Sequence, residues 1–343
     1  MVVCFGELLL RLSPAGRERL VQADTFEVRY GGAEANVAAA VVMFGGKSRY
    51  VTKVPDSVIG EAAVQSVRRY GVDTDGVVRG GERLGAYYLE KGASYRPSKV
   101  QYDRKHSAIA EAGREDFDWQ KLLDSADSFF FTGITPAVSD PEILMDALKL
   151  CKERNIRVYC DLNYRAALWS AEDAGRILGK MMPYVNVCVA NEEHVRLLFG
   201  ITPDEDLTDE EDRLGDIGRK MTETFGFAKV VLTLRESISS DDNEVAAVLY
   251  ENGALYKSSR YKVHIVDRVG GGDALSAALI YSESPDVKDK VIDPADREVQ
   301  IDFACAANAL KHSIEGDICI ADAGEVKKTM EIARSGGRVR LVR

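Results

Sequence analysis

The sequence contains no apolar run that approaches the roughly 20 residues needed to span a bilayer. It also lacks an excess of positive charge: 45 Lys and Arg residues are outnumbered by 55 Asp and Glu residues, which gives a net charge of −10. This balance disfavours a general nucleic-acid binder or a protein that binds anionic membranes. The first apolar segment has no basic leader and is interrupted by Gly6, Glu7 and Arg11. We therefore expect a buried strand there rather than a signal peptide, and a cytoplasmic protein.

Cysteine is scarce and unpatterned. The six cysteines form no Cys-x-x-Cys pair and show no spacing to histidine that is typical of a metal site. Several lie inside apolar segments, so we interpret them as reduced thiols in the core of a cytoplasmic protein.

Short apolar segments alternate with longer segments of helical periodicity along most of the 343 residues. Near-continuous apolar strands separated by helices are typical of a mostly parallel sheet covered on both faces, so we predict an α/β fold. Strands are expected at 2–5, 50–54, 129–131, 157–162, 185–190, 229–234 and 244–250. Helices are expected near 34–44, 60–70, 141–154, 171–182, 208–225, 273–283, 298–313 and 323–334.

Two regions interrupt this alternation. Residues 8–30 and 84–104 show period-two patterns with no helix between the apolar positions, as at Phe26, Val28 and Tyr30. We predict that they form a small antiparallel sheet, inserted in two pieces into the main domain. Such an appendage would cover a site at the edge of the main sheet.

The segment Val266-Asp-Arg-Val-Gly-Gly-Gly-Asp273 is the most informative part of the chain. Gly270, Gly271 and Gly272 permit backbone angles and close approaches that a β-carbon would prevent. The helix that follows has unpaired N–H groups and a positive dipole end, so this turn is suited to bind a phosphate. We expect Asp273 at its mouth to stay ionised, because a helix N-terminus favours negative charge.

An ionised Asp273 could accept the proton of a hydroxyl group that attacks a phosphoryl group. A purely structural turn that ends in a helix N-cap would also favour these four residues. Gly270 to Asp273 alone therefore do not decide between a structural turn and a phosphate-binding turn. The motif is not a Walker A loop, because no Gly-Lys-Ser/Thr follows it, and it is not a dinucleotide fingerprint.

Gly-Gly-Gly-Asp at this late position resembles the carboxy-terminal signature of the ribokinase-like (PfkB) carbohydrate kinases, commonly written Asp-Thr-x-Gly-Ala-Gly-Asp. Further motifs occur in the family's order, and several are similar to those of its 2-keto-3-deoxygluconate kinases. They are Gly31-Gly-Ala-Glu-Ala-Asn-Val-Ala-Ala-Ala40, Tyr102-Asp-Arg104, Phe131-Thr-Gly-Ile-Thr135 and Asp161-Leu-Asn-Tyr-Arg-Ala-Ala-Leu-Trp169.

The resemblance runs from residue 2 to residue 335 and implies one ribokinase-like α/β kinase domain over residues 1–343. The regions 8–30 and 84–104 would be its β-sheet lid. ATP and Mg²⁺ are the implied cofactors, and the need for K⁺ is left open. In the family, the lids of two subunits often clasp each other, so we expect a homo-oligomer, a dimer through the lid. Aromatic side chains expected to be exposed there, Tyr30, Tyr87 and Tyr88, are compatible with this.

The resemblance also implies which residues bind the sugar. Gly32 and Ala33 would let it approach the backbone, and Asn36 would bond its hydroxyls. An acidic substrate in a protein of net negative charge needs a local cation, and the planar fork of Arg is suited to a carboxylate. Residues expected on the lid would supply this contact, namely Tyr88, Tyr102 and Arg104. An exposed strand position remains the alternative for Arg104.

A second group of residues would act on the phosphates. The resemblance implies that Arg165, at a carboxyl end of the sheet, clamps the transferring phosphate and also contacts the sugar, whereas a surface salt bridge is the alternative. Asp273 would be the base, and the amides of Gly270 to Asp273 would form the anion hole. The nucleotide would contact Asn163, Asn191, Thr233, Arg235, Gly270, Gly272 and Asn308.

Three positions depart from the family pattern. In Asn191-Glu-Glu-His194 the last residue replaces the glutamate that helps to organise magnesium, and imidazole is a poor magnesium ligand. Glu192 or Glu193 could take over, or the nucleotide phosphates could hold the ion, so no metal ligand is assigned. A glycine usual near Arg235 is missing. Arg268 replaces threonine and either adds positive potential or faces solvent.

These observations predict a kinase that transfers the γ-phosphoryl group of ATP to the 6-hydroxyl of 2-keto-3-deoxygluconate. A kinase for fructose, ribose or a related keto-deoxy acid is the alternative within enzymes. A non-catalytic sugar or nucleotide sensor on the same fold remains a further alternative. A nicotinamide-dependent dehydrogenase is disfavoured, because no Gly-x-Gly-x-x-G follows the first strand.

Overall fold

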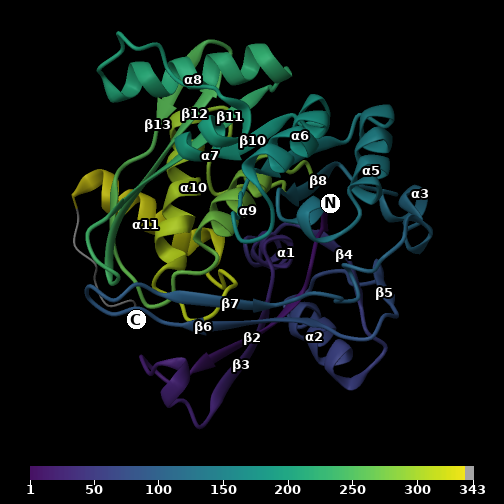
Figure 1. The fold of residues 1–343 in the computed structure, drawn as a ribbon. Coiled ribbons are helices and arrows are strands. Elements are labelled where there is room, and N and C mark those ends of the chain that lie inside the picture. The colour runs from purple at the N-terminus through teal and green to yellow at the C-terminus, as the bar shows by residue number, and fades with distance from the viewer. Residues whose placement is uncertain (337–343) are drawn as a thin grey trace.

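The computed structural model describes residues 1–336 and contains two β-sheets (Figure 1). The larger sheet has ten strands in the order β13-β12-β11-β10-β9-β8-β1-β4-β5, with β14 paired to β12. All neighbours from β11 to β5 are parallel, whereas β12, β13 and β14 are joined by antiparallel pairing. The strands are β1 (Val2–Phe5), β4 (Ser48–Val54), β5 (Val77–Arg79), β8 (Ser128–Thr132), β9 (Arg157–Asp161), β10 (Val187–Ala190), β11 (Lys229–Ser237), β12 (Asp242–Glu251), β13 (Ala254–Lys257) and β14 (Tyr261–His264).

Helices cover both faces of this sheet, and each face has its own core. Alternate residues of a strand point to opposite faces, so Val2 and Cys4 of β1 join one core while Val3 and Phe5 join the other. The first core is closed by α1 (Ala33–Met43), α2 (Val58–Arg68), α9 (Gly271–Glu283), α10 (Arg297–Lys311) and α11 (Ala323–Ser335). The second is closed by α5 (Pro141–Glu153), α6 (Ala171–Met181), α7 (Glu192–Phe199) and α8 (Glu210–Phe225). The predicted α/β fold is therefore confirmed.

The second sheet has four strands in the order β3-β2-β6-β7. They are β2 (Leu9–Pro14), β3 (Phe26–Gly31), β6 (Gly85–Glu90) and β7 (Lys99–Asp103). Each of the two predicted segments forms an antiparallel pair, and β2 joins β6 in parallel to unite them. This sheet lies at the lower end of the molecule in Figure 1, across from α8. The prediction of a small second sheet built from two pieces of chain is confirmed, but the sheet is mixed rather than antiparallel, because β2 and β6 run parallel to each other.

The local sequence explains where most helices begin. Asp140 accepts a hydrogen bond of 3.0 Å from the Glu142 N–H and is followed by Pro141, which suits the first helical turn. Six strands and α-helices among the described residues escaped the sequence pattern, namely β5, β13, β14, α3 (Trp119–Leu122), α4 (Thr135–Val138) and α7. Helix α7 is only eight residues long and begins at Glu192-Glu-His, and β5 has three half-buried residues. No helix within residues 1–336 is long and apolar enough to cross a membrane.

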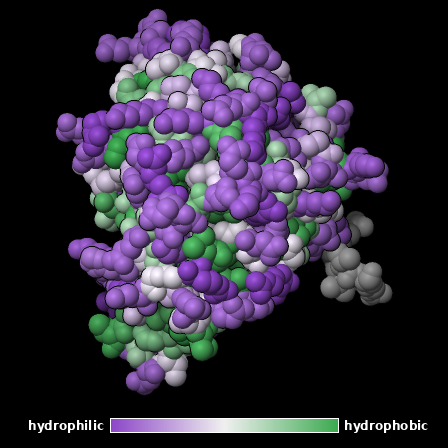
Figure 2. Space-filling model, turned by 90° about the vertical axis from the view of Figure 1, so that its right-hand side faces the viewer, coloured by the Kyte–Doolittle hydropathy of each residue, from purple (hydrophilic) through white to green (hydrophobic). Residues whose placement is uncertain are grey.

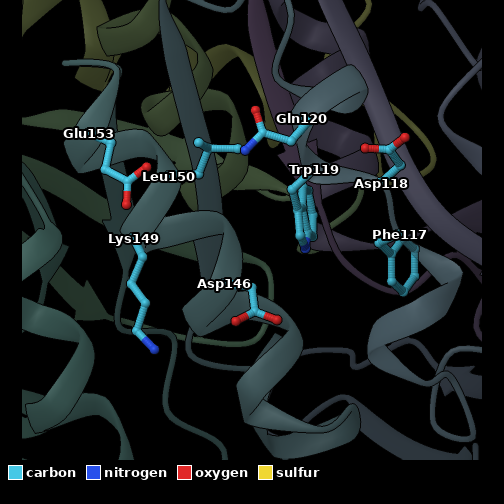
Figure 3. Close-up of a pocket in the computed structure, with 8 residues that line it drawn as sticks. All are labelled: Phe117, Asp118, Trp119, Gln120, Asp146, Lys149, Leu150 and Glu153. Carbon is cyan, nitrogen blue, oxygen red and sulfur yellow. The ribbon is translucent and has the colours of Figure 1, made fainter.

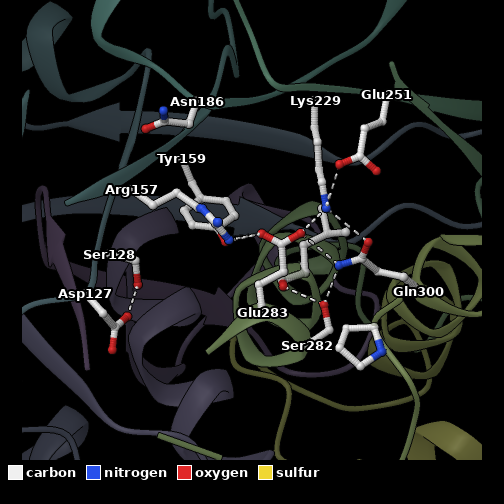
Figure 4. A network of polar contacts seen from close by, with 12 residues as sticks. Asp127, Ser128, Arg157, Tyr159, Asn186, Lys229, Glu251, Ser282, Glu283 and Gln300 are labelled. Carbon is white, nitrogen blue, oxygen red and sulfur yellow. Dashed lines mark hydrogen bonds and ion pairs between the residues drawn. The ribbon is translucent and has the colours of Figure 1, made fainter. Parts of the chain in front are cut away.

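A buried polar cluster fixes the C-terminal end of α9 (Figure 4). Glu283 accepts hydrogen bonds from Tyr159 at 2.6 Å, from Arg157 at 2.8 Å and from Gln300 at 3.0 Å, and it pairs with Lys229. Arg157 and Lys229 are the first residues of their strands, so this cluster lies at the amino-terminal edge of the parallel sheet. It anchors the helix whose other end carries Asp273.

Candidate active site

The carboxyl ends of the parallel strands bring several polar side chains to one edge of the sheet. Glu7 follows β1, Asp161 ends β9 and Asn191 follows β10. Ligand sites of open α/β sheets lie at this edge. The N-termini of α1 and α9 meet at the same place, because Asn36 of α1 and Asp273 of α9 are hydrogen-bonded.

The glycine turn forms as predicted and needs its first glycine for two reasons. Gly270 has a φ of 90° at the N-cap of α9, a left-handed conformation that glycine adopts without strain. A β-carbon there would also lie 1.8 Å from the carbonyl oxygen of Asp317. Gly271 and Gly272 then form the first turn of the helix, so their N–H groups belong to its unpaired amino end.

Asp273 is buried, with 8% of its surface exposed, and its Oδ2 accepts a hydrogen bond of 2.7 Å from the Asn36 side-chain amide. Within residues 1–336 it has no ion-pair partner. Burial raises the pKa of Asp273 to about 7, the Asn36 hydrogen bond lowers it, and the neighbouring carboxylates of Asp161 and Glu34 raise it further. The expectation that Asp273 stays fully ionised was therefore wrong, because burial and like charges outweigh the helix dipole.

Two further carboxylates share this environment. Burial raises the pKa of Asp161 to about 6, although the Arg165 guanidinium opposes the shift. Glu34 is buried and accepts hydrogen bonds from Thr132 and Thr135, and burial raises its pKa as well. The sequence analysis did not assign Glu34 a role. Its only signal was a charged residue among the small residues of the motif at 31–40.

The residues expected to bind the sugar backbone lie at the start of α1. Ala33 begins the helix, and the Asn36 side chain accepts a hydrogen bond of 3.4 Å from the Gly32 N–H. A β-carbon on Gly32 would lie 2.0 Å from the carbonyl oxygen of Glu7. The structure therefore requires glycine at position 32 for packing against the chain that follows β1.

The residues expected on the second sheet differ in their surroundings. Tyr88 is half-buried with its ring centroid 6.0 Å from that of Phe26, and the Arg104 guanidinium lies 5.1 Å from the centre of the Tyr102 ring. Tyr87 is buried and donates its hydroxyl to Asp317, so the expectation that it is exposed was wrong.

Arg104 lies in a buried ion pair rather than at an open surface. Its Nε donates to Glu7 Oε2 over 2.7 Å, and its Nη2 donates to the same oxygen. The side chains of Arg104 and Glu7 are 9% and 4% exposed. Within residues 1–336, Nη1 of Arg104 donates to no protein atom.

Arg165 follows β9 and is exposed, and within the described part of the chain it makes no salt bridge. The surface-salt-bridge reading of Arg165 therefore finds no support in residues 1–336. Asn163 holds a left-handed φ of 35°, and its backbone N–H donates to Asp161 over 3.0 Å. Asn191 caps α7 by accepting from the His194 N–H over 2.7 Å, and the Thr233 hydroxyl donates to the Ala190 carbonyl over 3.2 Å.

Asn308 lies on α10 beside the glycine turn. Its Oδ1 is buried and has no hydrogen-bond partner in residues 1–336, and it lies 3.0 Å from the position of a β-carbon on Gly271. Arg268 is half-buried near the exposed Arg235, and burial followed by repulsion from Arg235 lowers the pKa of Arg268. An unpaired amide oxygen and two arginines thus lie near the glycine turn.

The residues that were considered for magnesium binding lie in the first turn of α7. His194 is a partly buried helix residue whose ring packs against Tyr164, and burial lowers its pKa. Glu192 is paired with Arg213 over 2.5 Å, whereas Glu193 is exposed. No group of three or more His, Cys, Asp or Glu residues within 1–336 is arranged to hold a metal ion. Magnesium bound through phosphates and water needs few protein ligands, so the site is compatible with such binding.

Four buried ionic residues that the sequence analysis did not assign lie under the glycine turn. Arg11 pairs with Asp267 over 2.6 Å and with Asp317, and Lys311 is buried beside them. The one signal in the sequence was a lone arginine within the apolar segment at 8–14.

Two hollows on the surface lie away from Asp273. One of about 370 Å³ lies between residues 117–120 and α5, where Figure 3 shows Lys149 and Glu153 of α5 on one side and Trp119 on the other. Another of about 270 Å³ lies next to Glu283. Neither of these two hollows is lined by Asp273, and the position of the candidate site is inferred from the strand ends.

Comparison with known proteins identifies the relatives of this chain. Residues 1–285 match the model described as pfkB family carbohydrate kinase. A 2-dehydro-3-deoxygalactonokinase of Haloferax volcanii is 31% identical over 337 residues, which is 98% of each chain. The crystal structure of a 2-dehydro-3-deoxygluconokinase from Thermotoga maritima has a TM-score of 0.91 and 47% identity, and covers 96% of this chain and 98% of its own. An uncharacterized sugar kinase from Pyrococcus horikoshii in complex with ATP shares the fold at a TM-score of 0.72 and 23% identity, covering 96% and 99%.

Proposed function

Because this chain belongs to the pfkB family and is an ATP-dependent carbohydrate kinase, we propose that it phosphorylates the 6-hydroxyl of 2-keto-3-deoxygluconate. The 47% identity to the Thermotoga maritima enzyme supports this substrate. The observation that carries the reaction is the buried Asp273, which has no ion-pair partner within residues 1–336 and lies directly beside the amide groups of the glycine turn.

In the proposed mechanism Asp273 accepts the proton of the attacking hydroxyl. A carboxylate with a pKa of about 7 is a stronger base than an ordinary aspartate, yet is half ionised at neutral pH. The proton leaves late in a loose phosphoryl-transfer transition state, so positioning of the hydroxyl contributes more than base strength. The Asn36 amide holds one oxygen of Asp273 and leaves the other for the substrate.

Charge that develops on the transferring phosphoryl group is stabilised by two elements. The N–H groups of Gly270 to Asp273 point toward the amino end of α9, where the helix dipole adds positive potential. Arg165 reaches the same edge of the sheet from the loop after β9, and its exposed guanidinium is available to clamp the phosphate and to contact the sugar.

The carboxylate of the sugar acid would meet Arg104. Two of its nitrogens are engaged by Glu7, and this contact fixes the guanidinium plane so that Nη1 can receive the substrate. Tyr102 lies against the same guanidinium, and Tyr88 is on the neighbouring strand. These residues would hold the substrate with Gly32, Ala33 and Asn36.

ATP would bind on the side of the glycine turn that faces away from the proposed sugar site. Asn308 would contact the adenine through its unpartnered oxygen, and Arg235 and Arg268 would add positive charge near the phosphates. Asn163, Asn191 and Thr233 complete the proposed nucleotide contacts. Mg²⁺ bound mainly by the phosphates would neutralise part of their charge. Glu193, the residue before His194 on α7, has an exposed carboxylate that could contact the ion through water.

We further propose that the second sheet is the lid of a single kinase domain over 1–343, with lid segments 8–30 and 84–104. Closure over the substrate would exclude water and limit hydrolysis of ATP. Apolar side chains gather at the lower end of the molecule in Figure 2, the end where Figure 1 places this sheet. Phe26 and Val28 of β3 are 39% and 58% exposed, and such a surface would suit a homodimer formed through the lid.

The galactonate epimer is a second candidate substrate, because the Haloferax volcanii relative is named for it and matches the chain over nearly its full length. The two sugar acids differ at one hydroxyl and carry the same carboxylate, so Arg104 would serve both.

The test is an ADP-release assay across sugar acids and neutral sugars, with mass spectrometry to identify the phosphorylated product. We expect the highest kcat/KM for 2-keto-3-deoxygluconate. A higher value for the galactonate epimer would reassign the substrate within the sugar acids. A higher value for ribose or fructose would contradict the role of Arg104 and the proposal.

A further inference from the structure

Two positively charged side chains are buried beneath the glycine turn. Arg11 on β2 is 1% exposed, and Lys311 in the last turn of α10 is 0% exposed. They face two buried carboxylates, Asp267 and Asp317, which are 2% and 3% exposed. A buried charge is unfavourable unless it is paired, so the close association of two cations with two anions needs a reason.

Asp267 fixes the backbone that leads into the turn. Its Oδ2 pairs with Arg11 over 2.6 Å and also accepts from the Gly316 N–H over 3.1 Å. Its Oδ1 accepts from the Val269 N–H over 3.2 Å. Burial alone would raise the pKa of Asp267, but Arg11 and Lys311 hold it below its usual value. This carboxylate is therefore ionised and neutralised by fixed partners.

Asp317 supports the turn from the other side. Its carboxylate accepts hydrogen bonds from Arg11 and from Tyr87, while its backbone carbonyl lies against Gly270. Arg11 and Tyr87 both belong to the second sheet. The sheet expected to hold the sugar and the turn expected to hold the phosphate are thus joined through one pair of carboxylates.

Lys311 lies directly next to the turn. Its Cε is 3.2 Å from the position of a β-carbon on Gly270, and its Nζ donates to the Ile314 carbonyl over 3.0 Å. Burial lowers the pKa of Lys311 more than the charges of Asp267 and Asp317 raise it. Lys311 forms no salt bridge within residues 1–336, so the Ile314 carbonyl is the contact that holds its Nζ beside the turn.

A monovalent metal ion at this place would need oxygen ligands with net negative charge. Both buried carboxylates that flank the turn already have fixed cationic partners, and Lys311 fills the space beside Gly270. The residues present therefore do not fit a K⁺ ion next to the turn.

We propose that Arg11 and Lys311 are positioning residues for the anion hole. Their fixed charges supply the positive potential that a bound monovalent cation would otherwise provide there. The enzyme then needs no K⁺. The proposal rests on the kinase activity of the family but not on the identity of the sugar, so it is tested with whichever sugar the substrate panel identifies.

The first experiment uses the unaltered protein. Activity and melting temperature are measured in potassium, sodium, ammonium and tetramethylammonium chloride at equal ionic strength. We expect kcat to agree within about twofold in all four salts, and the melting temperature to be unchanged, because an ion that binds the folded state would raise it. Activation by potassium of more than about tenfold over tetramethylammonium, or a potassium-specific rise in melting temperature, would overturn the proposal.

The second experiment removes the ammonium group. We expect Lys311→Met to lower kcat by about 10²-fold with a smaller change in KM for ATP, and ammonium or potassium ions to restore part of the loss. Lys149→Met, at an exposed position on α5, is the matched control and should behave as the unaltered protein. A folded Lys311→Met protein with normal kcat, or with a loss that no cation relieves, contradicts a role of the charge. If the variant does not fold, the salt series decides alone.

Discussion

The side-chain amide of Asn36 donates a hydrogen bond of 2.7 Å to Oδ2 of Asp273. The two residues are 237 positions apart in sequence, and their contact joins the amino ends of α1 and α9 at the edge of the main sheet. It is the main interaction that opposes the rise in the pKa of Asp273, because it stabilises the ionised form.

This contact predicts the pH dependence of the reaction. A base with a pKa of about 7 must lose its proton to act, so kcat/KM should rise with pH and level off above about 7. Asn36→Ala removes a hydrogen bond to the ionised form and should move the midpoint to higher pH. The measurement is kcat/KM against pH for both proteins, with Gln65→Ala at an exposed position of α2 as the control. A midpoint that stays near the usual value for aspartate, 3.8, would contradict the environment described for Asp273.

Replacement of the base should separate catalysis from binding. We expect Asp273→Asn to lower kcat by about 10³-fold, because the amide cannot accept the proton of the hydroxyl. ATP binding, measured by calorimetry, should be nearly unchanged. Asp124→Asn, at an exposed position, is the control. Retention of normal turnover by Asp273→Asn would exclude the assigned role.

Arg165 is expected to act on the transition state more than on the bound substrates. Arg165→Ala should reduce kcat by about 10² to 10³-fold with a smaller effect on KM, because charge on the phosphoryl oxygens grows during transfer. Arg176→Ala, at an exposed position of α6, should leave both constants unchanged. A change confined to KM would place Arg165 on the sugar instead.

Arg104 should discriminate acids from neutral sugars. We expect Arg104→Ala to raise KM for a sugar acid by about 10²-fold, the equivalent of one charge-assisted contact, and to affect a neutral sugar much less. The assay compares both substrates in the same preparation, with Arg83→Ala as a control from the loop before β6. Equal effects on both sugars would mean that the variant acts only through the loss of the Glu7 pair.

The cluster around Glu283 predicts an acid-sensitive contribution to stability. Burial would raise the pKa of Glu283, but Lys229, Tyr159 and Gln300 lower it from its usual 4.5 to about 2. Because the pKa of Glu283 is lower in the folded state than in the unfolded state, its ionised carboxylate stabilises the fold at pH values above the usual pKa of 4.5. This stabilisation is lost as the pH falls from about 5 towards 2. Glu283→Gln should therefore reduce the free energy of unfolding by about 2 to 3 kcal/mol at pH 7 and by much less at pH 3.

Urea unfolding at the two pH values measures this difference. Glu205→Gln replaces an exposed glutamate and serves as the control. An equal loss at both pH values would show that Glu283 acts through packing rather than through its charge.

Local pattern was sufficient to predict most strands of the main sheet and most longer helices. The strand at 2–5 is a continuous apolar segment buried on both faces, the helix at 141–153 repeats hydrophobic residues with the helical period, and Pro141 marks a helix start. The glycine turn was predictable for the same reason, since its conformation depends on four adjacent residues. The roles of the site residues at strand ends were implied by the resemblance to the PfkB kinases, and the position of Arg165 after a predicted strand agreed with where sites lie in open α/β sheets.

Pairing between distant residues could not be predicted. Arg104 meets Glu7 across 97 positions, and Arg11 meets Asp267 across 256. The alternation of residues in the second sheet gave no indication of which face packs against the core, so Tyr87 was placed outside although it lies inside. The raised pKa of Asp273 has the same origin, because it depends on Asp161 and Glu34 from other elements.

The six cysteines are all buried and unbonded, and burial raises the pKa of each thiol. Cys4, Cys305 and Cys319 belong to one core, and Cys151, Cys160 and Cys188 belong to the other. An alkylating reagent reacts with thiolates, so it can modify only molecules that have opened. The mass of the labelled peptides would then reveal which side of the sheet separates first on heating, without any engineered probe.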